Sequence, residues 1–147
     1  MPEIIRATAE ALVRRHGTRD PFLLALYEDV RVLRPVLPER IHGFYQLRNG
    51  QRTIRVNALL PPPAARAVCA HELGHALLHP AENSQFLSGN RLALPGRLEN
   101  DAELFAFYLL TEPPFLQGYD TLERMASVTG LSEKAITLGL RDCGVMA

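Results

Sequence analysis

The sequence predicts an α+β fold in which a small, mainly antiparallel sheet of about three strands packs against several helices. The strongest strand signal flanks Asn49-Gly50, a dipeptide favoured in two-residue hairpin turns. Two segments, 64–79 and 98–110, are rich in alanine and leucine, which favour helices. Helical patterns also lie before and after these segments, so the sheet is expected to sit among helices.

Two short helices are expected at the N-terminus. Residues 3–15 carry apolar side chains at helical spacing, and Gly17 ends that helix. Asp20 followed by Pro21 resembles an N-cap with proline at the first helical position. A second helix is therefore expected to begin at Pro21.

The three strands are expected next. Residues 30–33 alternate between polar and apolar side chains and predict a strand. Residues 43–48 and 51–57 are the two arms of the predicted hairpin. Pro61-Pro62-Pro63 ends the sheet and can open the helix over 64–79.

The rest of the chain predicts a loop followed by three helices. Residues 81–97 predict mainly a loop, with a short extended piece near Phe86-Leu87 or Leu92-Ala93-Leu94. The helix over 98–110 is expected to stop at Pro113-Pro114. Two further helices are expected, with Asp120 and Ser132 as their N-caps.

Length and composition fit one domain that spans residues 1–147. Basic and acidic residues number 16 each, and this neutral balance argues against direct binding to nucleic acid or to an anionic membrane. No apolar run approaches membrane-spanning length, and the N-terminus lacks a signal-peptide pattern. Two cysteines are too few for a disulfide framework, so we expect a cytoplasmic protein.

One motif carries most of the functional information: His71-Glu72-Leu73-Gly74-His75. Histidines four residues apart on a helix project from the same side, so both imidazoles can bind one metal ion. Glu72 is offset by about a hundred degrees around the helix and can act as a general base beside the metal. The alternative is a chance match on an exposed helix, which the flanking alanines and leucines disfavour.

A third ligand is expected from the helix over 98–110. Glu99 and Glu103 share one helical face with two small alanines, which would let that face pack against the metal helix. We choose Glu99 as the ligand and Glu103 as the partner of a ligand histidine's other ring nitrogen. Asp101 points largely elsewhere and is the alternative third ligand.

The remaining candidates near the motif are weaker. His79 could be an alternative ligand, a group that supports a ligand, or a helix cap, and a supporting role is favoured. Cys69 precedes His71 by two residues, faces away from it, and is expected to be a buried thiol. Zinc is the expected metal, with manganese and iron open as alternatives, because geometry and supply decide among divalent ions.

Two motifs together resemble the ImmA/IrrE family of metallopeptidases. Residues 71–79 resemble the family's metal helix, and residues 99–106, with Leu109-Leu110 and Pro113 after them, resemble its second motif. The chain departs from that motif at Asp101, where the family usually has Glu, and at Glu103, where it usually has Asn. The resemblance implies a minimal zincin-like fold, and helix-turn-helix transcriptional repressors as substrates.

The leading hypothesis is therefore a zinc-dependent endopeptidase that acts as an anti-repressor. Glu72 would move the protons, and Tyr45, Tyr108 and His79 are candidates for stabilising the oxyanion. The alternative is a non-catalytic, metal-stabilised module that binds and sequesters a repressor or another protein. A DNA-binding helix-turn-helix over residues 121–141 is a third possibility, but the neutral charge disfavours it.

Overall fold

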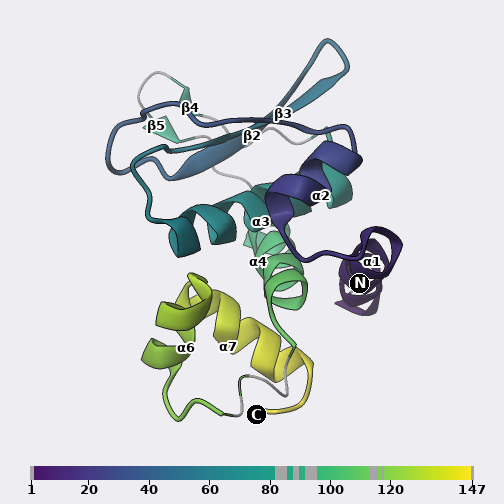
Figure 1. Ribbon diagram of the computed structural model, residues 1–147, viewed down its shortest axis with the longest axis vertical. Helices are drawn as coiled ribbons and strands as arrows, with labels where there is room; N and C mark the ends of the chain where they lie inside the picture. Colours follow the sequence, from purple (N-terminus) through teal and green to yellow (C-terminus); the bar gives the residue numbers. More distant parts are fainter. Residues whose placement is uncertain are drawn as a thin grey trace.

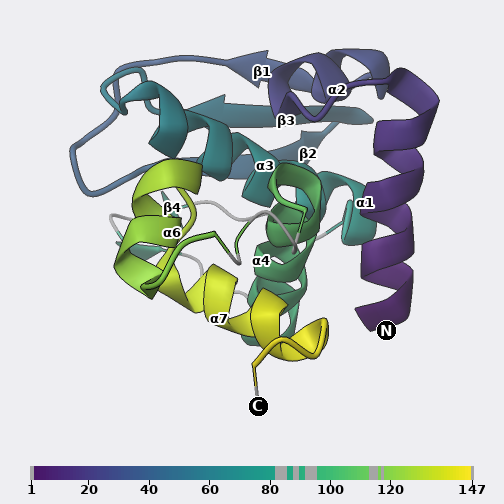
Figure 2. The same ribbon diagram turned by 60° about the horizontal axis from the view of Figure 1, so that its bottom comes forward.

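The computed structural model describes residues 2–81, 86–87, 90–91, 96–112, 116 and 118–146. A sheet lies at one end of the molecule, with helix α3 (Pro62–Leu78) beneath it (Figure 1). Helix α4 (Gly96–Leu110) packs against α3, and α6 (Leu122–Thr129) and α7 (Glu133–Asp142) lie at the end away from the sheet (Figures 1 and 2). The predicted α+β fold is confirmed.

The sheet has three strands: β1 (Arg31–Leu33), β2 (Gly43–Arg48) and β3 (Gln51–Val56), in the order β1-β3-β2. The predicted hairpin joins β2 and β3, and Asn49 and Gly50 have the positive φ angles that its turn requires. Strand β1 pairs with β3 in parallel. The sheet is therefore mixed. The segment between β1 and β2 leads the chain to the opposite edge of the sheet, and β3 then returns between these two strands.

The two N-terminal helices match the prediction, with α1 at Pro2–His16 and α2 at Pro21–Tyr27. Gly17, at a φ of 68°, follows α1. Asp20 caps α2, since its Oδ1 accepts a hydrogen bond from the backbone N–H of Phe22 at 2.9 Å. Helix α1 packs along α4, away from the sheet.

A glycine sets the approach of the two central helices. A Cβ atom on Gly74 of α3 would lie 3.1 Å from Cδ1 of Phe105 and 3.3 Å from the Cα of Ala102, both on α4. These distances are tighter than ordinary side-chain contacts, so a glycine lets the backbones come this close. The small residues on α4 that the sequence placed on this face are buried at the contact, and the two metal motifs are thereby held together.

The C-terminal helices pack against the core. Ser132 caps α7 as predicted, because its Oγ accepts from the backbone N–H of Ala135. The predicted cap of α6 is wrong by one residue: Thr121, not Asp120, accepts from the N–H of Arg124. Helix α7 buries one face on α4, made of Ala135, Ile136, Gly139 and Leu140. These two helices therefore serve packing.

The segment after α3 contains a small second sheet. Strand β4 (Phe86–Leu87) pairs with β5 (Asn90–Arg91) in antiparallel fashion. The sequence suggested an extended piece at Phe86-Leu87 but not its partner strand. The other suggested piece, Leu92-Ala93-Leu94, and the expected helix stop at Pro113-Pro114 lie outside the described residues.

One cluster of buried apolar side chains joins the described helices and the sheet. Its largest fully buried members are Tyr45, Phe105 and Phe107. Cys69 belongs to the cluster as a free thiol, as predicted, and Cys143 is also free. Across the part of the chain that the structure describes, every helix falls short of the length and apolarity needed to cross a bilayer.

Candidate metal centre

Helices α3 and α4 bring His71, His75 and Glu99 together. One ligand atom from each of the three residues lies within 4.8 Å of the other two. Glu99 Oε1 is 2.7 Å from His75 Nε2 and 3.6 Å from His71 Nε2. Both imidazoles therefore present the same nitrogen to one carboxylate, which comes from the first turn of the neighbouring helix.

These separations fit a zinc-sized ion. Two ligand atoms that each stand about 2.05 Å from zinc at tetrahedral angles are about 3.3 Å apart. The two distances to Glu99 fall on either side of that value. Two imidazoles and one carboxylate are also donors that zinc, manganese and iron all accept. The group could therefore hold a divalent metal after small side-chain shifts.

A second glutamate orients the first histidine. Glu103 Oε1 lies 2.5 Å from His71 Nδ1, and the Oγ of Ser132 donates to Glu103 Oε2 at 2.9 Å. If the proton of the neutral ring is on Nδ1, the unprotonated Nε2 faces Glu99. A histidine that binds a metal through Nε2 needs this tautomer. This geometry supports the role suggested for Glu103. It also connects the metal group to the N-cap of α7.

The other two candidates, His79 and Asp101, pair with each other. His79 lies one helical turn after His75. His79 is buried as the C-cap of α3, and its Nε2 lies 3.4 Å from Asp101 Oδ2. Asp101, the alternative third ligand, is therefore directed toward His79 and not toward the pair of His71 and His75. Nδ1 of His75 is buried and has no hydrogen-bond partner among the described residues.

The charges of these groups are strongly coupled. Burial alone would lower the pKa of His71, but hydrogen bonds to Glu103 and Glu99 outweigh burial and raise it to about 10. Hydrogen bonds from His71 and His75 hold the pKa of Glu99 well below its usual range. Burial acts to raise the pKa of Glu103, but the hydrogen bond to His71 and the charge of that ring outweigh burial and lower the pKa of this carboxyl. Metal-free, the site is therefore an ion-pair network.

Glu72 shares a cleft with this group. The cleft has a volume of about 580 Å³ and is walled by α3, α4, the loop before β2 and the turn between α6 and α7. Glu72 is 4% exposed, so it is almost fully buried where it lines the cleft. Glu72 lines the same cleft as His71 and Glu99, and its charge raises the pKa of His71.

The cleft includes residues that the sequence did not single out. His42 and Arg40 come from the loop before β2, and Lys134 comes from the first turn of α7. No local motif surrounds them, and only the folding of distant segments brings them to the cleft. The hydroxyls of Tyr45 and Tyr108, suggested for the oxyanion, donate instead to Pro80 O and to Asp142 Oδ2.

Comparison with known proteins identifies the family. Residues 25–140 match the family model of the M78 peptidases that is described as the IrrE N-terminal-like domain. The chain is also 32% identical to the uncharacterized immunity region protein 2 of Bacillus phage phi105 over 132 residues, which cover 87% of this chain and 84% of that relative. The match spans both helices of the candidate metal centre, and the chain therefore belongs to the ImmA/IrrE family of peptidases.

Proposed function

We propose that this chain is a zinc-dependent endopeptidase that cleaves a helix-turn-helix repressor. The observation that carries the proposal is the group of His71, His75 and Glu99, together with Glu72, which lines the same cleft as His71 and Glu99. Among the described residues, no fourth histidine, cysteine or acid joins the group. Three protein ligands are typical of catalytic zinc, whereas structural zinc usually has four. The site therefore favours hydrolysis over a purely structural metal.

Each residue of the site has a separate task in this mechanism. His71, His75 and Glu99 would hold the metal, and Glu103 would keep His71 in the required tautomer through its bond to Nδ1. The metal, when bound, supplies a Lewis acid that acidifies water and polarises the scissile carbonyl. Glu72 would accept the proton of the attacking water and transfer it to the leaving amine.

The substrate class follows from kinship. The relative from Bacillus phage phi105 is an immunity region protein, and the family resemblance implies repressors as substrates. Both point to the control of a mobile element or a stress regulon. We place the reaction in the cytoplasm, where two free thiols such as Cys69 and Cys143 would stay reduced.

The decisive variant is Glu72→Gln, which keeps the shape of the side chain and removes its basic oxygen. Wild type, the variant and a control, Glu123→Gln, are loaded with zinc and incubated with the repressor encoded nearest to this gene, with and without chelator. Glu123 is an exposed acid on α6, so its variant controls for the loss of one charge. Intact mass spectrometry reports cleavage, and metal analysis reports zinc.

We expect one metal-dependent cut by wild type and by Glu123→Gln. The variant Glu72→Gln should retain zinc and lose roughly 10²- to 10⁴-fold in rate, the usual contribution of a general base. Cleavage by Glu72→Gln at the wild-type rate would rule out this mechanism. A stable complex without cleavage, equal for wild type and Glu72→Gln, would instead support the sequestering module.

A further inference from the structure

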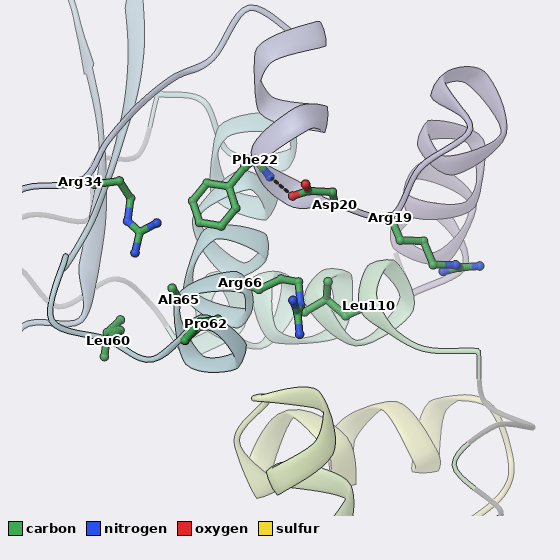
Figure 3. Close-up of a pocket in the computed structure, with 9 residues that line it drawn as sticks. All are labelled: Arg19, Asp20, Phe22, Arg34, Leu60, Pro62, Ala65, Arg66 and Leu110. Carbon is green, nitrogen blue, oxygen red and sulfur yellow. Dashed lines mark hydrogen bonds between the residues drawn. The ribbon is translucent and has the colours of Figure 1, made fainter.

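A second pocket lies away from the metal centre. It has a volume of about 450 Å³ and lies among the start of α2, the first turns of α3, the segment after β1 and the end of α4 (Figure 3). It shares no lining residue with the metal cleft, because the two hollows use different faces of α3. Its volume lies within the range of pockets that hold small molecules.

Arginines from three separate elements line this pocket, and one of them has a structural task. Arg19 donates to the backbone oxygens of Tyr108 and Leu109 and to Glu112 Oε1, at 3.2, 3.0 and 3.1 Å. These bonds satisfy carbonyls at the C-terminal end of α4. The charge of Arg19 is therefore already balanced by the protein.

The other two arginines have no such partner. Among the residues that the structure describes, no carboxylate forms an ion pair with Arg34 or Arg66, and no hydrogen bond from either is formed. The guanidinium carbon of Arg34 stands 5.2 Å from the ring centroid of Phe22. Stacking of this kind holds a guanidinium in place and leaves its N–H edge available to an acceptor.

One acid also lines the pocket, but it is engaged. Asp20 caps α2 through its Oδ1, which accepts from the N–H of Phe22 (dashed in Figure 3). With Arg19 and Glu112 counted as a neutral pair, two cations and one carboxylate line the pocket. The rest of the lining is apolar and comes from Phe22, Leu60, Pro62, Ala65 and Leu110. The pocket thus combines excess positive charge with an apolar wall.

We propose that this pocket binds a small organic anion, a carboxylate or phosphate ester with an apolar body. Arg34 and Arg66 would bind the anionic group, for which a guanidinium fork is well suited. The apolar body would lie against Leu60, Pro62 and Leu110. A small molecule fits better than nucleic acid or membrane, because the available cations lie within one hollow and the chain as a whole is neutral.

The test uses phenyl phosphate as the probe, with inorganic phosphate and phenol as its two halves. The full chain is titrated by NMR, and binding is read from the backbone amides of Ala65 and Leu110, so that any contact at the metal centre is seen separately. Arg34→Gln and Arg66→Gln remove one cation each. Arg14→Gln, an exposed arginine of α1 outside the pocket, is the matched control.

We expect saturable binding of phenyl phosphate to wild type and to Arg14→Gln. Each pocket variant should weaken binding by about fivefold to tenfold, since one charged hydrogen-bond donor is lost. Equal affinity for wild type and both pocket variants, no saturable shift at these amides, or equal binding of phenol would each overturn the proposal. It would also be overturned if a short acidic peptide bound at least tenfold more tightly than phenyl phosphate, because the pocket would then dock protein.

Discussion

Gly43 of strand β2 lies close to both β3 and α3, and replacing it by alanine is expected to destabilise the protein. A Cβ atom there would lie 2.5 Å from the backbone oxygen of Arg55 and 2.7 Å from Cγ1 of Val68. Ordinary contacts begin at 3.4 Å, so the first overlap is roughly 0.9 Å. The side chain of Val68 can rotate, but the oxygen of Arg55 belongs to the sheet backbone.

The cost follows from how this overlap can be relieved. Forcing an extra methyl group into a packed site typically costs about 1–3 kcal/mol. Moving the end of β2 away from β3 would also weaken the pairing of Gly43 with Val56, at about 1 kcal/mol for one hydrogen bond. The stiffer unfolded chain of the alanine variant returns about 0.4–1 kcal/mol. We therefore expect a net loss of about 2 kcal/mol.

Urea unfolding of Gly43→Ala beside Gly96→Ala measures this loss. Among the residues that the structure describes, none but its chain neighbours and its own helix backbone comes within 4 Å of an ideal Cβ on Gly96, so this variant should stay within about 0.5 kcal/mol of wild type. A loss of about 2 kcal/mol should lower the melting temperature by roughly 4–8 °C for a chain of this size. Equal unfolding midpoints and slopes for Gly43→Ala and wild type would refute the reasoning.

Three further predictions concern the metal site and its partners, and one concerns the thiols. Zinc binding at pH 8 should release about one proton, because His71 with its raised pKa of about 10 must lose that proton to become a ligand; calorimetry in two buffers of different ionisation enthalpy measures it. The same shift stabilises the metal-free protein fully below pH 6.5, the ordinary value, and this contribution is lost as the pH rises through about 10. Ser132→Ala should cost about 1 kcal/mol in urea unfolding, because it removes the N-cap of α7, and should weaken zinc binding slightly through Glu103. Cys69 should resist a thiol reagent in the native protein while Cys143 reacts, since burial raises the pKa of Cys69 and leaves it no access to solvent.

Features encoded by neighbouring residues could be predicted from the sequence. Asn49-Gly50 specifies its turn through backbone conformations that these two residues tolerate, and Asp20 caps the helix that begins at the next residue. The spacing of His71 and His75 fixes their common face once the segment is helical. The prediction of Glu99 as a ligand required one further assumption, that the small residues of α4 face α3. The close contact at Gly74 explains why they do.

Features that depend on distant segments could not be predicted. The parallel pairing of β1 with β3 is set by where the chain returns, and no residue of β1 encodes it. His42 and Lys134 reach the cleft only through the packing of the loop before β2 and of α7. The cap of α6 shows a local failure: Asp120 and Thr121 are both good caps, and Thr121 is the one whose Oγ1 meets the N–H of Arg124.

The charge balance of the cleft would suit a divalent cation. Glu72, Glu99 and Glu103 all raise the pKa of His71, so a metal-free site keeps a proton on that ring to offset part of their negative charge. A divalent ion at His71, His75 and Glu99 would replace this proton and add one more positive charge. An asparagine at position 103 would leave less negative charge to offset. Glu103 would therefore increase the site's need for a cation, while its contact with His71 Nδ1 would orient that ring.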